Sequence, residues 1–243
     1  MYTKNVDFTL TSGTSELSGL RTDVVALFSD IRGFSNWCET QSLDNVADLM
    51  TIQFERVIQI CNDHHHSFHK FLGDGFVLLW EPDEDLTLDH CLAHALDAAF
   101  HLHKKYWYLS KDLAYPAPSG YGVGIAVGQA IRIQPETFLR EMNEVDFVGY
   151  PLNCAARMQT LASGYGTVVC SATARMLERS PDQFLHPSVP GFRRSLISPP
   201  NAILERAAQL KGLRSADRTD FRYLSYIDGQ AQLWGVTGIP DEA

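Results

Sequence analysis

The sequence has no apolar run of the roughly 20 residues that a transmembrane helix requires. Residues 1–19 are polar and lack the apolar core of a signal peptide. The five cysteines are scattered, odd in number and include no C-x-x-C pair, which argues against a disulfide framework. We therefore expect a cytoplasmic protein that does not insert into a membrane and whose reduced cysteines serve in packing.

Acidic residues outnumber basic ones: the chain has 20 Lys and Arg and 29 Asp and Glu, which gives a net charge of −9. This charge argues against a nucleic-acid backbone as a partner. A single nucleotide can still bind where cationic groups gather and a divalent metal offsets the charge. The 243 residues are 45% hydrophobic and 20% charged, and they show neither repeats nor low-complexity segments. These properties favour one globular α/β domain with additional segments.

Apolar periodicity divides the chain into alternating strands and helices. Residues 24–28 (VVALF) are typical of a buried strand, and from Asp44 to about His64 the apolar positions recur at helical spacing. The remaining expected elements are a hairpin at 68–80, a helix at 86–109, a strand at 120–133, a helix at 152–162, a strand at 167–171, a short helix at 172–179 and a closing strand at 221–227. Residues 181–200 hold several prolines and are expected to form a loop. The order β-α-β-β-α-β-α-β predicts helices packed on a mixed sheet.

The expected hairpin carries a lysine and an aspartate within an apolar run. Gly73, Asp74 and Gly75 suit a tight turn, because glycine and aspartate tolerate positive φ. Turn chemistry does not explain Lys70, whose desolvation is costly unless an anion approaches it. Asp30 ends the first strand, and the ends of adjacent strands can bring two carboxylates close together. Two Mg²⁺ or Mn²⁺ ions about 3.5–4 Å apart would relieve the repulsion and recruit a polyphosphate; the alternative for Asp30 is a helix cap or turn residue.

Two further groups of residues point to a nucleotide. The turn after Asp30 offers backbone N–H groups around Gly33 and Phe34 that could cradle phosphate oxygens. Asn153 and Arg157 are four residues apart on an expected helix and so share one face, where they could bind a ribose and a phosphate. The alternative for this pair is a first helical turn with an exposed arginine.

The run HHHSFH at 64–69 raises the question of a zinc site. Adjacent histidines at a helix end point in different directions, and the run lacks an i, i+4 ligand pair with a carboxylate. We therefore expect solvated histidines at the end of a helix.

Three stretches together resemble the catalytic domain of the class III nucleotidyl cyclases in order and spacing: FSDIRGFS, KFLGDGFVLLW and DFVGYPLNCAARM. The resemblance covers about residues 22–227. It implies an α+β fold, a ferredoxin-like βαββαβ sandwich with a mixed sheet and packed helices. The catalytic domain is then expected at 23–230, between an N-terminal lead-in at 1–22 and a C-terminal tail at 231–243. The implied activity is that of a phosphorus–oxygen lyase, which converts a nucleoside triphosphate into its 3′,5′-cyclic monophosphate, a second messenger, and pyrophosphate.

The same resemblance implies a metal site built from two acids. The metal-binding acids of the family match Asp30 and Asp74, and the family's contact from a backbone carbonyl falls on Ile31. These groups would hold two divalent ions, Mg²⁺ or Mn²⁺, beside the phosphate cradle at Gly33 and Phe34. No organic cofactor is required.

Five further positions match the family's nucleotide-binding residues. The lysine that reads the purine in adenylyl cyclases matches Lys70, and its acidic partner matches Asp146. The ribose-orienting asparagine matches Asn153, and the arginine that stabilises the transition state matches Arg157. Lys211, in LKGL, is a looser match for the lysine that holds the terminal phosphates. Since one subunit of these cyclases gives the acids and the other gives the base, ribose and transition-state residues, the resemblance implies a homodimer with two shared sites. The product would act on a downstream effector.

The preferred base has two interpretations. A donor at Lys70 and an acceptor at Asp146 suit the ring N1 and 6-amino group of adenine, which favours ATP as the substrate and cAMP as the product. The alternative is a pyrimidine cyclase of the bacterial Pycsar anti-phage systems, which make cUMP or cCMP, because lone cyclase domains are common there. A cyclase-like binding module should have lost a metal acid or the arginine. This chain keeps both, together with the other positions that match closely: Asp30, Asp74, Lys70, Asp146, Asn153 and Arg157. The GGDEF sequence of diguanylate cyclases is missing.

Overall fold

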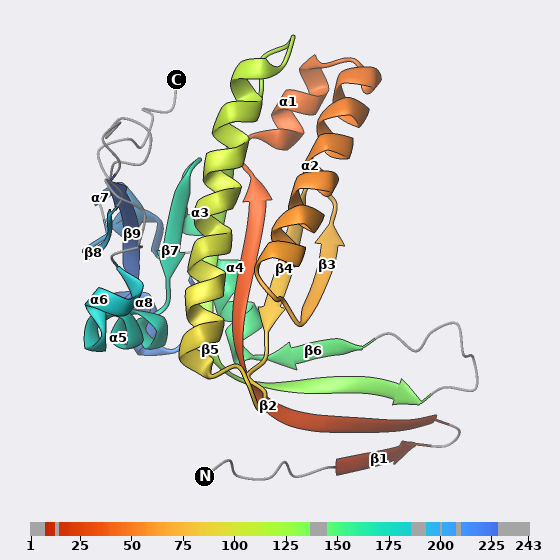
Figure 1. Ribbon diagram of the computed structural model, residues 1–243, viewed down its shortest axis with the longest axis vertical. Helices are drawn as coiled ribbons and strands as arrows, with labels where there is room; N and C mark the ends of the chain where they lie inside the picture. The colour runs from red at the N-terminus through yellow and green to blue at the C-terminus, as the bar shows by residue number, and fades with distance from the viewer. Residues whose placement is uncertain are drawn as a thin grey trace.

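The computed structural model of the protein describes residues 8–12, 15–136, 145–185, 193–199, 201–207 and 210–227; the expected tail at 231–243 lies outside them. A single sheet carries helices on both faces (Figure 1). The strands are β1 (Phe8–Ser12), β2 (Ser15–Ile31), β3 (Phe68–Leu72), β4 (Gly75–Trp80), β5 (Tyr121–Glu136), β6 (Asp146–Gly149), β7 (Gly166–Val169), β8 (Arg193–Ile197) and β9 (Arg222–Ile227). The helices are α1 (Phe34–Thr40), α2 (Leu43–Asp63), α3 (Leu88–Asp112), α4 (Tyr150–Leu161), α5 (Ser171–Arg179), α6 (Pro181–Phe184), α7 (Asn201–Arg206) and α8 (Ser215–Thr219).

The sheet is mixed and has a ferredoxin-like centre. Its strands run in the order β3-β4-β2-β5-β7-β9-β8, while β1 pairs with β2 and β6 pairs with β5. Strands β5 and β7 are parallel, and the other described pairs are antiparallel. The four strands β2 to β5, with α2 and α3, form the βαββαβ unit, so the predicted α+β fold is confirmed. Within the described ranges, no helix combines the length and apolar character needed to cross a membrane.

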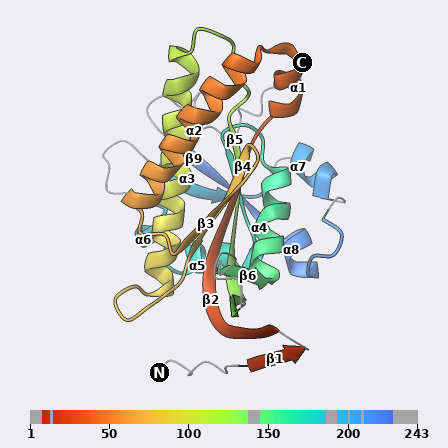
Figure 2. The same cartoon turned by 90° about the vertical axis from the view of Figure 1, so that its right-hand side faces the viewer.

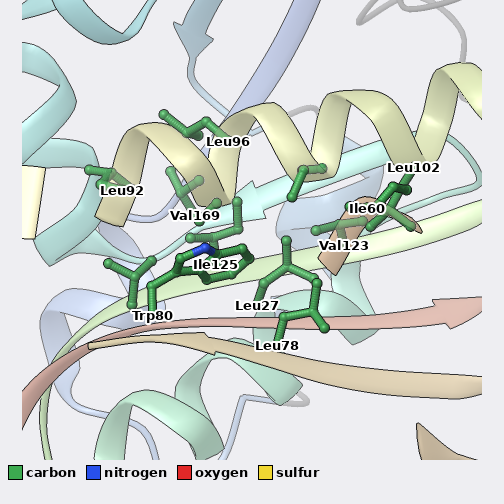
Figure 3. Packing of buried hydrophobic residues seen from close by; sticks show 14 of the residues in the cluster. Leu27, Ile60, Leu78, Trp80, Leu92, Leu96, Leu102, Val123, Ile125 and Val169 are labelled. Atoms are coloured by element: carbon green, nitrogen blue, oxygen red, sulfur yellow. The ribbon is translucent and has the colours of Figure 1, made fainter. Parts of the chain in front are cut away.

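The middle of strand β2, residues 24–27, is buried on both faces because its apolar run leaves no polar side. Val25 and Leu27 pack with α2 and α3, whereas Val24 and Ala26 pack with α4. All four side chains are fully buried. Figure 3 shows Leu27 among apolar side chains beneath α3. A strand sandwiched between two apolar layers gives its C-terminal end a rigid support, and that end carries the first acid.

The helices are divided between the two faces of the sheet. Helices α2 and α3 cover one face, and α4 covers the other (Figure 2). The hydroxyls of Ser42 and Thr87 cap α2 and α3 by accepting hydrogen bonds from the first helical turns. The C-terminal end of β2 leads directly into α1, beside the turn between β3 and β4 (Figure 1).

Several segments differ from the sequence-based expectations. The stretch SDIRGFSNW at 29–37 was expected to be a turn, but from Phe34 onward it belongs to the short helix α1. The expected polar lead-in contains β1 and the first half of β2, which pairs along its length with β5. The expected loop at 181–200 contains α6 and β8, and β8 extends the sheet by pairing with β9. Strand β6 was not expected. The short strands β6 and β8 lack a clear periodic pattern, and their backbone groups are satisfied by pairing with β5 and β9.

The buried His103 should make the folded protein less stable in acid. It is fully buried in α3, with Nε2 2.9 Å from the hydroxyl of Thr167, and burial lowers its pKa to about 3. Because the pKa of His103 is lower in the folded state, acid protonates this histidine in the unfolded chain before it does so in the folded protein. The free energy of unfolding therefore falls as the pH drops below about 6.5. Between pH 7 and pH 5, His103 should lower the free energy of unfolding by about 2 kcal/mol. Urea unfolding of the wild type and of His103→Gln across this range measures the difference, and the variant should show the shallower dependence.

The matched control for this experiment is His90→Gln, since His90 is an exposed histidine at the start of the same helix. Its replacement should leave the pH dependence of unfolding as in the wild type. Equal pH dependences for the wild type and His103→Gln would contradict the prediction.

Candidate active site

Two acids meet where β2 ends beside the hairpin formed by β3 and β4. Asp30 lies one residue past Ser29, the last β2 residue that pairs with β4, and Asp74 lies in the two-residue turn between β3 and β4. A Cβ at Gly75 would lie 2.8 Å from the carbonyl oxygen of Ser29, so only glycine allows the turn to approach β2 this closely. The adjacent Gly73 has a φ of +71°, which suits the tight turn.

The close approach of the two carboxyl groups favours a bound proton on Asp74 in the absence of a cation. Burial, followed by the hydrogen bond to Asp30 and its charge, raises the pKa of Asp74 to about 7. Backbone N–H groups of Asp74 and Ile31 donate to the same carboxylate and act in the opposite direction. At neutral pH the pair therefore carries less than its full negative charge, and a bound cation would favour the loss of the remaining proton.

The ligand atoms at this position fit hard divalent ions. Mg²⁺ and Mn²⁺ prefer carboxylate and carbonyl oxygens, which is what Asp30, Asp74 and the Ile31 backbone offer. The side chain of Ile31 is buried, with 2% exposure, and this anchors its backbone at the strand end. Asp30 remains 42% exposed, so the site is open to solvent and to a phosphate.

Arg32 is a further residue at the site that the sequence analysis did not identify. Its Nη1 lies 3.7 Å from Oδ2 of Asp30, and its Nη2 donates to the backbone carbonyl of Gln159 at the end of α4. A side chain at Gly122 would collide with the Arg32 guanidinium, so glycine leaves room for it on β5. Arg206 donates to the next carbonyl of α4, that of Thr160, at 3.0 Å. Arg32 therefore joins Asp30 to the C-terminus of α4. The sequence could have indicated this role, because Arg32 stands only two residues after Asp30.

Gly33 and Phe34 lie at the start of α1, directly after the first acid. Gly33 has a φ of +74° and precedes the first helical residue, Phe34, which is half-buried. The first N–H groups of a helix have no partner within the helix, so they remain available to other acceptors. The expected backbone cradle thus follows Asp30 closely in the chain.

Lys70 and Asp146 form an ion pair although 76 residues separate them. Nζ of Lys70 on β3 lies 3.1 Å from Oδ2 of Asp146 on β6, and the two side chains are 46% and 52% exposed. The rings of Phe68 and Phe147 pack edge-to-face with centroids 5.2 Å apart. The structure therefore brings together the two residues that were expected to read the base, in a surface position that a ligand can reach.

Asn153 and Arg157 are exposed on α4, whose other side packs on β5 and β2. Within the described part of the chain, neither side chain makes a hydrogen bond or an ion pair with another side chain. The structure does not bring them into contact with the two acids of the same chain. Lys211 is also exposed, in a turn. On either side of it in the chain, Arg206 donates to the carbonyl of Thr160 and Asp217 accepts from the hydroxyl of Tyr150, both on α4.

The sequence of residues 19–187 matches the family described as the adenylate and guanylate cyclase catalytic domain. The chain belongs to this family. Its catalytic domain is of the adenylyl and guanylyl cyclase type, as the resemblance implied, and the characterised relatives of this type are lyases. No curated protein matches the sequence.

Solved structures of cyclases share the fold. The adenylyl cyclase CyaB from Pseudomonas aeruginosa matches with a TM-score of 0.63 at 14% identity, over 86% of this chain and 96% of that chain. The guanylyl cyclase Cya2 matches with a TM-score of 0.57 at 19% identity, over 85% and 92% of the two chains. The catalytic core of a rhodopsin–guanylyl cyclase with converted specificity, in complex with ATPαS, matches with a TM-score of 0.59 at 15% identity, over 85% and 97%.

Proposed function

We propose that this cyclase converts ATP to 3′,5′-cAMP and pyrophosphate, with two divalent metal ions, in a homodimer that forms two shared sites. The observation that carries the proposal is the pair of hydrogen-bonded carboxyl groups, Asp30 and Asp74, at the end of a rigid strand. Such a pair is costly to keep in an empty site and useful in one that receives cations.

Asp30, Asp74 and the Ile31 carbonyl would hold the two ions. When bound, the ions supply charge neutralisation of the triphosphate and a lower pKa for the ribose 3′-hydroxyl. The N–H groups at Gly33 and Phe34 bind phosphate oxygens beside the acids. Arg32 links the end of β2 to the end of α4, because it pairs with Asp30 and donates a hydrogen bond to the Gln159 carbonyl.

The remaining nucleotide contacts come from the partner protomer. Asn153 orients the ribose so that the 3′-oxygen faces the α-phosphorus, and Arg157 balances the charge that develops on the α-phosphate. Lys211 binds the terminal phosphates. The exposure of Asn153 and Arg157 on the outer face of α4, away from the acids of their own chain, supports this division between two protomers.

Lys70 and Asp146 select the base. A Lys donor beside an Asp acceptor fits the N1 and 6-amino group of adenine. Cytosine presents the same order of groups at N3 and its 4-amino group, whereas guanine and uracil present a ring N–H where the lysine donates. The 3.1 Å contact between the two side chains holds this donor and acceptor together. Because cytosine matches this donor and acceptor as adenine does, CTP, with cCMP as the product, is the second candidate.

A substrate survey tests the function. Purified protein is incubated with each of the four nucleoside triphosphates and Mn²⁺, and the products are identified by mass. We expect cAMP as the main product, with GTP and UTP as poor substrates. A main product of cCMP would support the second candidate, and cUMP or cGMP would contradict the assigned role of the base pair. No cyclic product from any nucleotide would contradict the proposed activity.

Exchange of the base-reading pair should change the preferred substrate. In Lys70→Glu/Asp146→Cys, the acceptor and donor that match adenine are removed, so kcat/KM for ATP should fall on the order of a hundredfold. The value for GTP should fall less or rise, since guanine offers donors at N1 and its amino group. Lys104→Glu, at an exposed lysine of α3, is the matched control and should retain the wild-type preference. An equal loss for ATP and GTP would contradict the assignment.

A further inference from the structure

Three potential metal ligands meet where α2 ends and β3 begins. They are Cys61 in the last turn of α2, His66 in the link, and His69 on β3, and their ligand atoms all lie within 4.8 Å of one another. The structure thus differs from the expectation of solvated histidines in this run. His64 is buried, with 8% exposure, and its Nε2 lies 2.9 Å from Nδ1 of His101.

The tautomer of His66 is determined by its neighbour. Nδ1 of His66 lies 2.8 Å from the carbonyl oxygen of Cys61. A carbonyl can only accept, so Nδ1 carries the proton and Nε2 presents a lone pair. Nε2 lies 2.9 Å from Nδ1 of His69. A ring N–H bound to a backbone carbonyl, with the other nitrogen turned toward further ligands, is the usual support of a metal-binding histidine.

We propose that Cys61, His66 and His69 form a binding site for Zn²⁺ that is separate from the active site. One thiolate and two imidazoles suit this borderline-soft ion, and three protein ligands leave the fourth tetrahedral position to water. The three ligands range from the buried Cys61 through the half-buried His66 to the exposed His69, so an ion can enter from solvent. Binding forms a Zn–S bond, and the thiol proton is released to water.

The backbone between α2 and β3 turns so that the three ligands face one another. His65 adopts a φ of +49°, a left-handed conformation that few residues other than glycine adopt. This turn reverses the chain after α2 and brings His66 back over Cys61.

A bound ion would join the end of α2 to the edge strand of the sheet. Strand β3 pairs with β4 alone among the described strands, so its outer edge has no other support. His69 faces α2, as does Phe71, whose ring packs on Phe54 at 4.5 Å. Lys70 points to the opposite face, toward Asp146. The ion would therefore stabilise the strand that carries Lys70 without touching the nucleotide, and this consequence alone depends on the proposed function.

Cobalt spectroscopy tests the site without measuring turnover. Protein treated with a chelator is titrated with Co²⁺, and a thiolate-to-cobalt charge-transfer band reports a sulfur ligand, which the acid pair cannot supply. We expect the band in the wild type and its loss in Cys61→Ser. His66→Ala and His69→Ala should each weaken binding at least about tenfold, the loss seen when even a second-shell partner is removed. Zn²⁺ should displace Co²⁺ and raise the thermal midpoint of the wild type, with no such rise in His69→Ala.

Two controls separate this site from other sulfur and histidine groups. His65→Ala removes an exposed neighbouring histidine and should keep the band and the affinity. Cys170→Ser alters the buried group formed by Cys154, Cys170 and Asp217, which is the other described cluster with metal-ligand spacing, and should also keep the band. The absence of a band in the wild type, its persistence in Cys61→Ser, or its loss in Cys170→Ser would overturn the proposal. Because His69 is exposed, His69→Ala is expected to fold, and circular dichroism checks this.

Discussion

Asp30→Ala and Asp74→Ala should each lower the rate of cyclisation at least about a thousandfold, or about 4 kcal/mol in the activation free energy. A single remaining carboxylate cannot hold two cations against the charge of a triphosphate. The fold should survive, because neither side chain belongs to the apolar core and because each substitution removes the repulsion between the two neighbouring acids. Initial rates with Mn²⁺ and the preferred nucleotide measure the loss.

Asp112→Ala is the matched control for these variants. Asp112 is an exposed acid in the last turn of α3, and its removal should leave the rate within about twofold of the wild type. Thermal unfolding should show that all three variants are folded. Near-normal turnover by either Asp30→Ala or Asp74→Ala would contradict the assignment of these acids to the metal ions.

A mixture of two inactive variants should regain activity. Asp74→Ala and Arg157→Ala homodimers each have a defect in both sites, but a heterodimer combines both defects in one site and leaves the other intact. Random exchange makes half of the dimers heterodimers, so an equal mixture should recover about a quarter of the wild-type activity. The exposed position of Arg157 makes a folding defect from this substitution unexpected.

The recovery is measured against subunit exchange followed by fluorescence energy transfer between labelled protomers. Mixing Asp30→Ala with Asp74→Ala is the control, because both acids act in the same half of a site and every dimer then has two defective sites. That mixture should stay inactive. An inactive mixture of Asp74→Ala and Arg157→Ala, with exchange demonstrated, would contradict the shared site.

Local sequence patterns were sufficient for most of the central fold. The apolar run at 24–28 and the helical spacing after Asp44 were clear because each element presents a continuous apolar surface to the core. Strand β6 and strand β8 were not predicted. Each is short, four and five residues respectively, and each is held by pairing with another strand, β6 with β5 and β8 with β9. Pairing of this kind leaves little trace in the local pattern.

At the candidate site, too, the sequence identified residues, whereas the structure showed which of them lie together. The resemblance to a cyclase pointed to Asp30, Asp74, Lys70 and Asp146, but it did not show whether the members of each pair touch. In the structure, burial and the neighbouring Asp30 raise the pKa of Asp74, and Lys70 and Asp146 form an ion pair. It also adds Arg32, whose guanidinium joins Asp30 to α4. The roles of these residues in catalysis remain predictions for the experiments above.

The sequence by itself determined the apolar layers, the tight turn at Asp74 and the family, because these depend on residue types at short, regular spacings. Only the tertiary structure decided which polar groups meet. The zinc proposal illustrates the reason. Within the run at 64–69 the histidines offered no ligand pair at helical spacing, but a left-handed turn at His65 places His66 over Cys61 and beside His69 on the next strand. A ligand set assembled across a chain reversal depends on backbone direction, which residue spacing alone does not specify.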